Sequence, residues 1–230
     1  MIKLEHVSKI YTNGKTSFPA LDNVSFSIEQ GEFAGIIGKS GSGKSTLLNI
    51  LSGVDRPSAG SVEINGELVS TLSGRKLTKW RAANIGIVFQ AFHLIPALTL
   101  LENVLLPMEF AKRGSRKKRR TRAMELLESV GLTERMNHFP DHVSGGEKQR
   151  TAVARSLAND PPVILADEPT GNLDSENAIQ IFSLFEQLAD EGKTVIIVTH
   201  DQELAEKTDR TLQVKDGRII STLARERGLL

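Results

Sequence analysis

The sequence predicts an α/β fold with a mostly parallel sheet, an antiparallel β-rich part at the N-terminus and a helical subdomain. Continuous apolar runs at residues 33–37, 163–166 and 194–198 are typical of strands that are covered on both faces of a parallel sheet. Residues 98–135, in contrast, are more charged and have a helical spacing of apolar positions. The chain is therefore expected to form one α/β core into which helices are inserted.

The expected elements alternate along the chain. Strands are predicted at residues 2–7, 24–28, 33–37, 61–64, 85–89, 163–166 and 194–198. Helices are predicted at residues 46–51, within 98–135, at 144–158 and at 178–189. The turn signal Asp216-Gly217 joins two last strands. We expect residues 1–230 to form a single domain with a helical subdomain at about 92–158.

The composition is that of an ordinary soluble domain, with 39% hydrophobic and 25% charged residues among 230. No stretch approaches 18 consecutive apolar residues, and the first residues lack the apolar segment of a signal peptide. The absence of cysteine excludes disulfides and thiolate metal sites. These features favour a soluble, intracellular protein.

Positive charge is concentrated in one segment. Residues 112–122 contain eight Lys or Arg and no acid, which leaves −7 on the rest of a chain whose net charge is +1. The run could bind nucleic acid or anionic lipid headgroups, or it could be a solvated loop that leads into a helix. No aromatic side chain is interleaved for stacking on bases, so we favour the solvated loop and expect no direct contact with nucleic acid.

A glycine-rich loop carries the clearest chemical signal. Residues 38–45 fit G-x-x-x-x-G-K-[ST] and lie between a predicted strand and a predicted helix. The glycines allow backbone N–H groups to approach phosphate oxygens, and the helix N-terminus adds positive potential. Lys44 would contact the β- and γ-phosphates of a nucleoside triphosphate, and Ser45 would ligate Mg²⁺. The other residues expected around the phosphates are Gly38, Lys39, Ser40, Gly41, Ser42, Gly43 and Thr46.

Two acids and a histidine follow buried strands. Asp167 and Glu168 come directly after the run at 163–166, and His200 follows the run at 194–198. Ligands gather at the carboxyl ends of parallel strands, so these side chains are expected beside the nucleotide. Asp167 could hold Mg²⁺, Glu168 could polarise a water for attack on the γ-phosphorus, and His200 could contact the γ-phosphate. The alternative is that the two acids merely end a strand in solvent.

The segment at residues 143–150, V-S-G-G-E-K-Q-R, resembles the signature loop L-S-G-G-Q-x-Q-R of ABC transporter ATPases. The glycine-rich loop precedes it, and the acidic strand end and the histidine follow it, in the order of that family. The resemblance extends from Leu4 to about Ile220. It implies a P-loop ATPase core that binds ATP with Mg²⁺.

The resemblance also implies roles for further residues. Tyr11 would stack on adenine, and Gln90 would sense Mg²⁺ and the attacking water as part of the catalytic set. Asp174 would meet the glycine-rich loop of a second copy of the chain, whose γ-phosphate would be held by Ser144, Gly145 and Gly146. Two copies would close around ATP as a symmetric homodimer and open after hydrolysis.

Two positions depart from the family's signature. Val143 replaces leucine, which is a small apolar change. Glu147 replaces glutamine, so a possible donor to the nucleotide becomes an acceptor when it is ionised. We expect a modestly altered affinity rather than an inactive site.

Longer matches, such as D-E-P-T-G-N-L-D at residues 167–174, resemble the ATPases of macrolide export, lipoprotein release, peptide-antibiotic resistance and cell division. This implies a separate membrane permease as partner and a cytoplasmic, peripheral position on the inner face of the cell membrane. Apolar side chains at 91–101, among them Phe92, Leu94, Ile95 and Leu98, would dock the permease unless they pack the helical subdomain. Two other functions stay open: a nucleotide-gated scaffold beside a membrane protein, and a soluble ATPase that acts on DNA or ribosomes.

Overall fold

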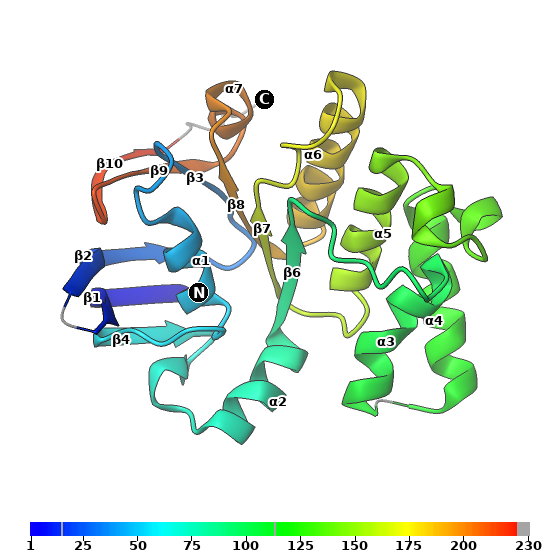
Figure 1. Cartoon of the computed structure of the whole chain (residues 1–230), viewed down its shortest axis with the longest axis horizontal. Helices are drawn as coiled ribbons and strands as arrows, with labels where there is room; N and C mark the ends of the chain where they lie inside the picture. The colour runs from blue at the N-terminus through cyan, green and yellow to red at the C-terminus, as the bar shows by residue number, and fades with distance from the viewer. Residues whose placement is uncertain (15, 113, 225–230) are drawn as a thin grey trace.

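The computed structural model describes residues 1–14, 16–112 and 114–224, which form two sheets flanked by helices (Figure 1). The larger sheet has the strand order β10-β9-β3-β8-β7-β6. Its strands are β3 Phe33–Ile37, β6 Ile85–Phe89, β7 Val163–Asp167, β8 Thr194–Thr199, β9 Arg210–Lys215 and β10 Arg218–Ala224. Only β10 runs antiparallel to its neighbour, and the other strands pair in parallel. The prediction of a mostly parallel sheet is confirmed.

A second, antiparallel sheet has the order β2-β1-β4-β5. Its strands are β1 Ile2–Asn13, β2 Thr16–Ile28, β4 Ala59–Ile64 and β5 Glu67–Leu68. β1 and β2 form a hairpin that continues beyond the two strands predicted at 2–7 and 24–28. Their register shifts around Val7, where His6 and Asn23 adopt positive φ angles of 51° and 52°. This irregularity and the exposed outer half of the hairpin interrupt the alternation from which strands are predicted.

Seven α-helices occur in the described part of the chain. They are α1 Lys44–Leu51, α2 Gly74–Asn84, α3 Leu100–Ala111, α4 Arg116–Ser129, α5 Gly145–Ser156, α6 Ser175–Asp190 and α7 Gln202–Glu206. α3, α4 and α5 follow β6 and stand together on one side of the sheet (Figure 1). α2 was not predicted, because only Leu77 and Trp80 on it are buried and the rest of its sequence is polar. Within the residues that the structure describes, none of the helices combines the length and apolarity needed to cross a membrane.

The basic run is largely helical, so the expectation of a solvated loop at 112–122 is wrong for most of it. α4 begins at Arg116, and the hydroxyl of Ser115 caps it by accepting a hydrogen bond from the backbone N–H of Lys118 at 3.3 Å. The helix continues to the buried side chains of Ala123 and Leu126, which fix its inner face. The cations therefore project from the exposed surface of a structured helix.

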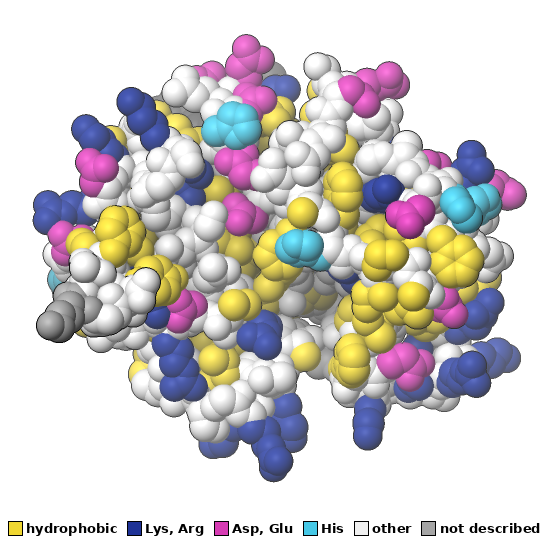
Figure 2. Space-filling view, viewed as in Figure 1, with side chains coloured by type: hydrophobic (Ala, Val, Ile, Leu, Met, Phe, Trp, Pro, Cys, Tyr) yellow, Lys and Arg dark blue, Asp and Glu magenta, His cyan; other side chains and the backbone are white. Residues whose placement is uncertain are grey.

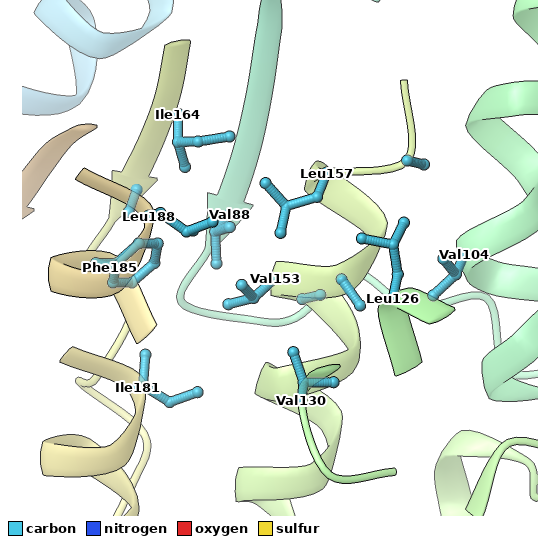
Figure 3. Close-up of a cluster of buried hydrophobic side chains, with 14 of the residues drawn as sticks. Val88, Val104, Leu126, Val130, Val153, Leu157, Ile164, Ile181, Phe185 and Leu188 are labelled. Carbon is cyan, nitrogen blue, oxygen red and sulfur yellow. The ribbon is translucent and has the colours of Figure 1, made fainter. Parts of the chain in front are cut away.

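One apolar cluster joins the helices to the sheet (Figure 3). Val88 of β6 and Ile164 of β7 lie on the sheet side of this cluster, and Val153 of α5 and its C-cap residue Leu157 lie beside them. Phe185 of α6, fully buried, belongs to the same cluster. α5 thus packs against the sheet, against α6 and against the outer helices α3 and α4.

We expect Gly86→Ala to destabilise the protein by about 1–3 kcal/mol, because overpacking a core forces the surrounding atoms to move. A Cβ at Gly86 would lie 2.5 Å from the carbonyl oxygen of Ser156 and 2.7 Å from Cδ1 of Ile164. Gly74→Ala is the matched control, because a Cβ at that position meets open space. Urea denaturation would measure both variants, and equal midpoints for the two would contradict the close packing of β6 against α5.

Candidate functional site

The glycine-rich loop connects β3 to α1, and its glycines are required by close approach to neighbouring strands. A Cβ at Gly38 would collide with the carbonyl of Val214. Gly43 has a φ of 107° and a Cβ there would lie 2.6 Å from the carbonyl oxygen of Ala20. These contacts hold the loop against β2 and β9, with the N-terminus of α1 directly behind it.

Polar groups of this loop point inward. The Lys44 ammonium donates to the backbone carbonyls of Gly38 and Lys39 at 2.8 and 3.1 Å. The hydroxyl of Ser42 is buried and has no hydrogen-bond partner among the described residues. Buried polar atoms are normally satisfied, so this hydroxyl and the backbone around it fit a bound anion such as a phosphate.

The loop forms the floor of a cleft of about 520 Å³. The cleft is lined by Tyr11, Phe18, Ala20, Ser40, Gly41, Gly43, Lys44, Ser45, Thr46, Gln90, Glu168 and His200. The structure therefore brings Tyr11, the glycine-rich loop, Gln90, Glu168 and His200 to one place, as the order of strands required. Phe18 was not predicted as a site residue. In the structure it is 61% exposed and lies directly opposite Tyr11 in the β1–β2 hairpin, a pairing that the sequence alone does not reveal.

Asp167 lies at the end of β7 and accepts a hydrogen bond from the hydroxyl of Ser45. Burial raises the pKa of its carboxyl, and the negative charge of Glu168 raises it further, against the opposing effects of Ser45 and Lys44. A half-buried carboxylate beside a hydroxyl offers two oxygen ligands of the kind that Mg²⁺ prefers. The pair Ser45–Asp167 therefore fits a divalent cation.

Glu168 follows in a strained backbone conformation. Its φ is 47°, in the left-handed region that non-glycine residues rarely adopt, and its N–H donates to the carbonyl of Val198 at 2.8 Å. The carboxylate Oε2 lies 2.8 Å from Nδ1 of His200 and also accepts from the backbone N–H of His200 at 3.3 Å. Strain of this kind is found at functional sites, where it fixes the direction of a side chain. Here it aims the carboxylate of Glu168 into the cleft beside His200.

Gln90 leaves the end of β6 and contacts the segment after Glu168. Its amide Nε2 donates to Oδ1 of Asn172 at 3.4 Å, and Nδ2 of Asn172 donates to the carbonyl of Gln90 at 3.0 Å. The following loop has positive φ at Phe92 and His93 and is held by the guanidinium of Arg155, which donates to both carbonyls. Asn172 and Arg155 were not predicted to matter, since only their contacts across the fold show that they hold this loop.

The apolar segment after Gln90 is only partly available at the surface. Leu94 is half-buried and packs against the apolar core cluster, which supports the packing alternative for this residue, and its role in docking stays a prediction. Ile95 is 40% exposed and stays available at the surface.

The signature residues lie elsewhere, at the N-terminus of α5. Ser144 is the N-cap: its hydroxyl accepts from the N–H of Glu147 at 3.2 Å, and the Glu147 carboxylate accepts from the N–H of Ser144 at 2.7 Å. Arg135 adds an ion pair to Glu147 with Nε–Oε1 at 3.2 Å. These hydrogen bonds, above all the one from the Ser144 N–H, lower the pKa of Glu147. Glu147, which stands where the family has glutamine, thus completes a capping box within the chain.

The two signature glycines and Asp174 occupy the neighbouring helix ends. Gly145 has room for a Cβ, whereas a Cβ at the buried Gly146 would collide with the amide of Asn177 on α6. Asp174 caps α6 by accepting from the backbone N–H of Asn177 at 2.9 Å, and the hydrogen bonds from Asn177 lower its pKa. None of these residues lines the cleft of the glycine-rich loop. One chain therefore holds two separate sets of predicted site residues.

Gln149, on the same helix, was also missed. It is fully buried, and its amide Nε2 donates to the carbonyl of Pro169 at 2.6 Å and lies 3.4 Å from the carbonyl oxygen of Phe89. α5 is thereby attached to the segments that follow both β6 and β7.

The hairpin side of the cleft is organised around Tyr11. Its hydroxyl donates to Oδ2 of Asp55 at 2.8 Å, and the Lys9 ammonium lies 4.9 Å from the ring centroid. Lys9 also forms an ion pair with Asp55 at 2.6 Å. Lys9 and Asp55 therefore fix the plane of the Tyr11 ring.

We expect Glu147→Ala to destabilise the chain by about 1 kcal/mol, because the variant leaves the N-cap N–H without its acceptor. Glu147→Gln should be nearly neutral at pH 7, since an amide oxygen can accept the same hydrogen bond. The lowered pKa of Glu147 means that its carboxylate stabilises the fold above the unfolded-state pKa, and that this gain disappears as the pH falls through the folded-state pKa. Urea midpoints across this acidic range would measure the effect. An Ala variant as stable as the Gln variant would refute the capping role.

Comparison with known proteins agrees with this site. The family model described as ABC transporter matches residues 21–171. An uncharacterized ABC transporter ATP-binding protein of Thermotoga maritima is 50% identical over 219 residues, which cover 95% of this chain and 93% of the relative. The uncharacterized ABC transporter ATP-binding protein MJ0796 of Methanocaldococcus jannaschii is 50% identical over 223 residues, or 95% of each chain.

Two solved structures are similar over the full length of both chains. A dimeric structure of MJ0796 in a post-hydrolysis state, bound to ADP and Pi, has a TM-score of 0.91 at 46% identity. A dimeric structure of MJ0796 described as a bacterial ABC transporter cassette has a TM-score of 0.91 at 48% identity. The cleft, the family match and these relatives together show that the chain belongs to the ABC transporter family, as an ATP-binding cassette with ATPase activity.

Proposed function

We propose that this chain is the ATP-hydrolysing subunit of an ABC transporter, which drives a separate membrane permease through ATP-dependent closure of a homodimer. One observation carries the proposal: the chain builds a complete phosphate cleft but holds its signature residues outside that cleft, at the N-terminus of α5. A second copy, placed head to tail, would supply the missing half of each site. The dimeric structures of the relative MJ0796 support this arrangement.

ATP would be bound by the glycine-rich loop, with Tyr11 stacked on adenine. The phosphates would receive backbone N–H groups from Gly38, Lys39, Ser40, Gly41, Ser42 and Gly43, the Lys44 ammonium, and Thr46 at the start of α1. The unpartnered hydroxyl of Ser42 supports this assignment. Mg²⁺, held by Ser45, Asp167 and Gln90, would neutralise charge on the phosphates. Its ligands are supported by the contact between Ser45 and Asp167.

Glu168 would act as the general base. Its carboxylate would accept a proton from a water positioned in line with the γ-phosphorus, while the bond from that phosphorus to the bridging oxygen breaks and ADP leaves. His200, hydrogen-bonded to Glu168 through Nδ1, would keep that carboxylate in place and contact the γ-phosphate through its other nitrogen. Lys44 would stabilise the charge on the transferred group.

The partner's γ-phosphate would meet the N-terminus of α5. The Ser144 hydroxyl uses its oxygen as acceptor for the N–H of Glu147, so its proton can be donated outward. Gly145 leaves room for an anion to approach the backbone, and the helix end adds positive potential. Gly146 would supply a backbone N–H, and Asp174 at the adjacent end of α6 would face the partner's glycine-rich loop.

The permease would dock near Gln90 and place the chain on the inner face of the membrane. Ile95 is exposed a few residues after Gln90, on a loop that Arg155 holds in one conformation. Movement of this loop would reach the cleft through the paired hydrogen bonds of Gln90 and Asn172. Coupling would then be reciprocal. If permease binding changes the affinity of the chain for ATP, then ATP binding changes its affinity for the permease by the same factor. The longer motifs at residues 167–174, which resemble those of macrolide-export and lipoprotein-release ATPases, support assigning the proposed transporter to that group.

Glu168→Gln should lower ATP turnover by about 10²- to 10⁴-fold, because the general base is lost. ATP binding should persist, and the variant should accumulate as an ATP-bound dimer on a sizing column. Glu206→Gln, an exposed change at the end of α7, is the matched control and should turn over ATP normally. Near-normal turnover in Glu168→Gln would remove Glu168 from the role of base.

Ser144→Arg should leave ATP binding to the monomer nearly intact but stop dimerisation and hydrolysis. Lys44→Ala should instead weaken ATP binding to the chain that carries it. A mixture of the two variants should form an ATP-dependent heterodimer, because one of its composite sites keeps both intact halves. If no mixture forms such a dimer, the head-to-tail arrangement is wrong.

Asp55→Ala should raise the KM for ATP about fivefold with little change in kcat, since loss of one hydrogen bond of about 1 kcal/mol releases the Tyr11 ring. Asp190→Ala removes a comparable exposed carboxylate at the end of α6 and should leave both constants unchanged. A fall in kcat at constant KM would show that Asp55 does not act through nucleotide binding.

A further inference from the structure

Two helices of this protein begin with the charge that a helix N-terminus disfavours. α2 starts with Arg75 and Lys76, and α4 starts with Arg116 and Lys117; neither helix has an acid in its first turn. Because the N-terminal end of a helix carries partial positive charge, cations there lower its stability. Both helices thus carry unfavourable charge in their first turn with no gain in stability, which indicates that these cations have a functional role.

The two helix starts lie on the same edge of the molecule. α2 contacts α3, and α3 contacts α4. In Figure 1 both α2 and α4 begin at the lower edge of the view, with the end of α3 between them. Figure 2 shows Lys and Arg side chains gathered along this edge. We define the basic edge by its exposed cations Arg75, Lys76, Lys79, Lys112, Arg116, Lys117, Lys118 and Arg120.

The charge of this edge is not balanced locally. Residues 74–84 and 112–122 contain twelve of the 29 Lys and Arg and no acid, which leaves −11 on the rest of the chain. In the described part of these two segments, Arg119 alone forms a salt bridge, with Glu109 at 2.9 Å. The protein is therefore strongly polarised, and an anionic surface would attract this edge and repel the remainder.

The basic edge does not serve the nucleotide. The phosphate cleft lies at the carboxyl ends of the parallel strands, whereas α2 leads into the amino end of β6. The two sites are thus at opposite ends of the sheet, and the basic edge is separate from the nucleotide site.

An exposed aromatic side chain lies within this edge. Phe110, in the last turn of α3, is 78% exposed. An apolar ring framed by cations fits the interface of a membrane, where the ring enters the headgroup layer and the cations meet phosphates. Binding of single-stranded nucleic acid would require several stacking rings, but the other aromatic residue on α2, α3 and α4, Trp80, is buried.

We propose that the basic edge binds the headgroups of anionic phospholipids. This goes beyond the proposed function, because it gives the chain its own affinity for the bilayer without a permease. In this permease-free state, α2 and α4 face the bilayer.

Co-flotation of the purified full chain with vesicles tests the proposal. The chain should float with vesicles of phosphatidylcholine containing about 30% phosphatidylglycerol, and not with phosphatidylcholine alone. Binding should be lost when KCl is raised from about 50 to about 300 mM, because salt screens the attraction. The double variants Arg75→Glu/Lys76→Glu and Arg116→Glu/Lys117→Glu should each bind at least about tenfold more weakly.

The control is the pair Lys3→Glu/Lys215→Glu, which changes the net charge equally at exposed positions on β1 and β9. The substitutions to Glu at the helix starts should not impair folding, because acidic residues are favourable at a helix N-terminus. Unchanged basal ATPase activity of these variants would verify this. The proposal is overturned if the wild-type chain ignores anionic vesicles at low salt. It is also overturned if the control pair weakens binding as much as the helix-start pairs, or if a short DNA duplex binds more tightly than the vesicles.

Discussion

The buried amide of Gln149 connects the parts of this structure that must act together. It lies on α5, and its Nε2 donates to the carbonyl of Phe89 at the end of β6 and to the carbonyl of Pro169 in the segment after β7. In a water-free interior such a hydrogen bond is costly to lose, since the carbonyl of Pro169 would remain without its donor. The helix that carries the signature is therefore attached to the segments that carry Gln90 and Glu168. A displacement at either strand end would be transmitted to α5 through the buried side-chain amide of Gln149.

Close packing adds to this attachment. The apolar cluster around Val153 and Phe185 fills the space between the sheet, α5 and α6. Densely packed interiors do not deform continuously, so elements that share such a cluster tend to move as one body. Leu4 of β1 and Leu21 of β2 belong to a different cluster with Leu47 of α1, which joins the N-terminal sheet to the helix after the glycine-rich loop. The hairpin that carries Tyr11 and the helix that carries the signature thus rest on separate cores on the two faces of one sheet.

Much of this could be predicted from sequence because the signals are local. Residues 85–89 and 163–167 end as strands within one residue of their predicted bounds, since buried parallel strands have continuous apolar sequences. The carboxyl ends of such strands then place Gln90, Glu168 and His200 together. α2 escaped prediction because two buried side chains in a polar helix give too weak a period. The first turns of α4 escaped for a related reason: their cations are exposed on nearly every position, so the capping Ser115 was the one local signal.

Contacts that depend on the folded chain could not be read from sequence. Nothing local pairs Asp55 with Tyr11, which is 44 residues away, or Gln90 with Asn172, which is 82 residues away. The role of Glu147 was missed for a different reason: the spacing Ser144-x-x-Glu147 is a local capping-box signal, but these residues were interpreted only as part of the nucleotide motif.

The packing of Gly146 against Asn177 has a mechanical consequence. With no side chain between them, α5 and α6 meet at their N-terminal ends, and Asn177 also holds the cap of Asp174. The two helix ends are packed too closely to approach each other further, so we expect α5 and α6 to move together. Ser144 and Asp174 would consequently contact a second molecule at a fixed distance from each other. That molecule must fit both residues at once, so a small misalignment would prevent binding before any chemistry begins.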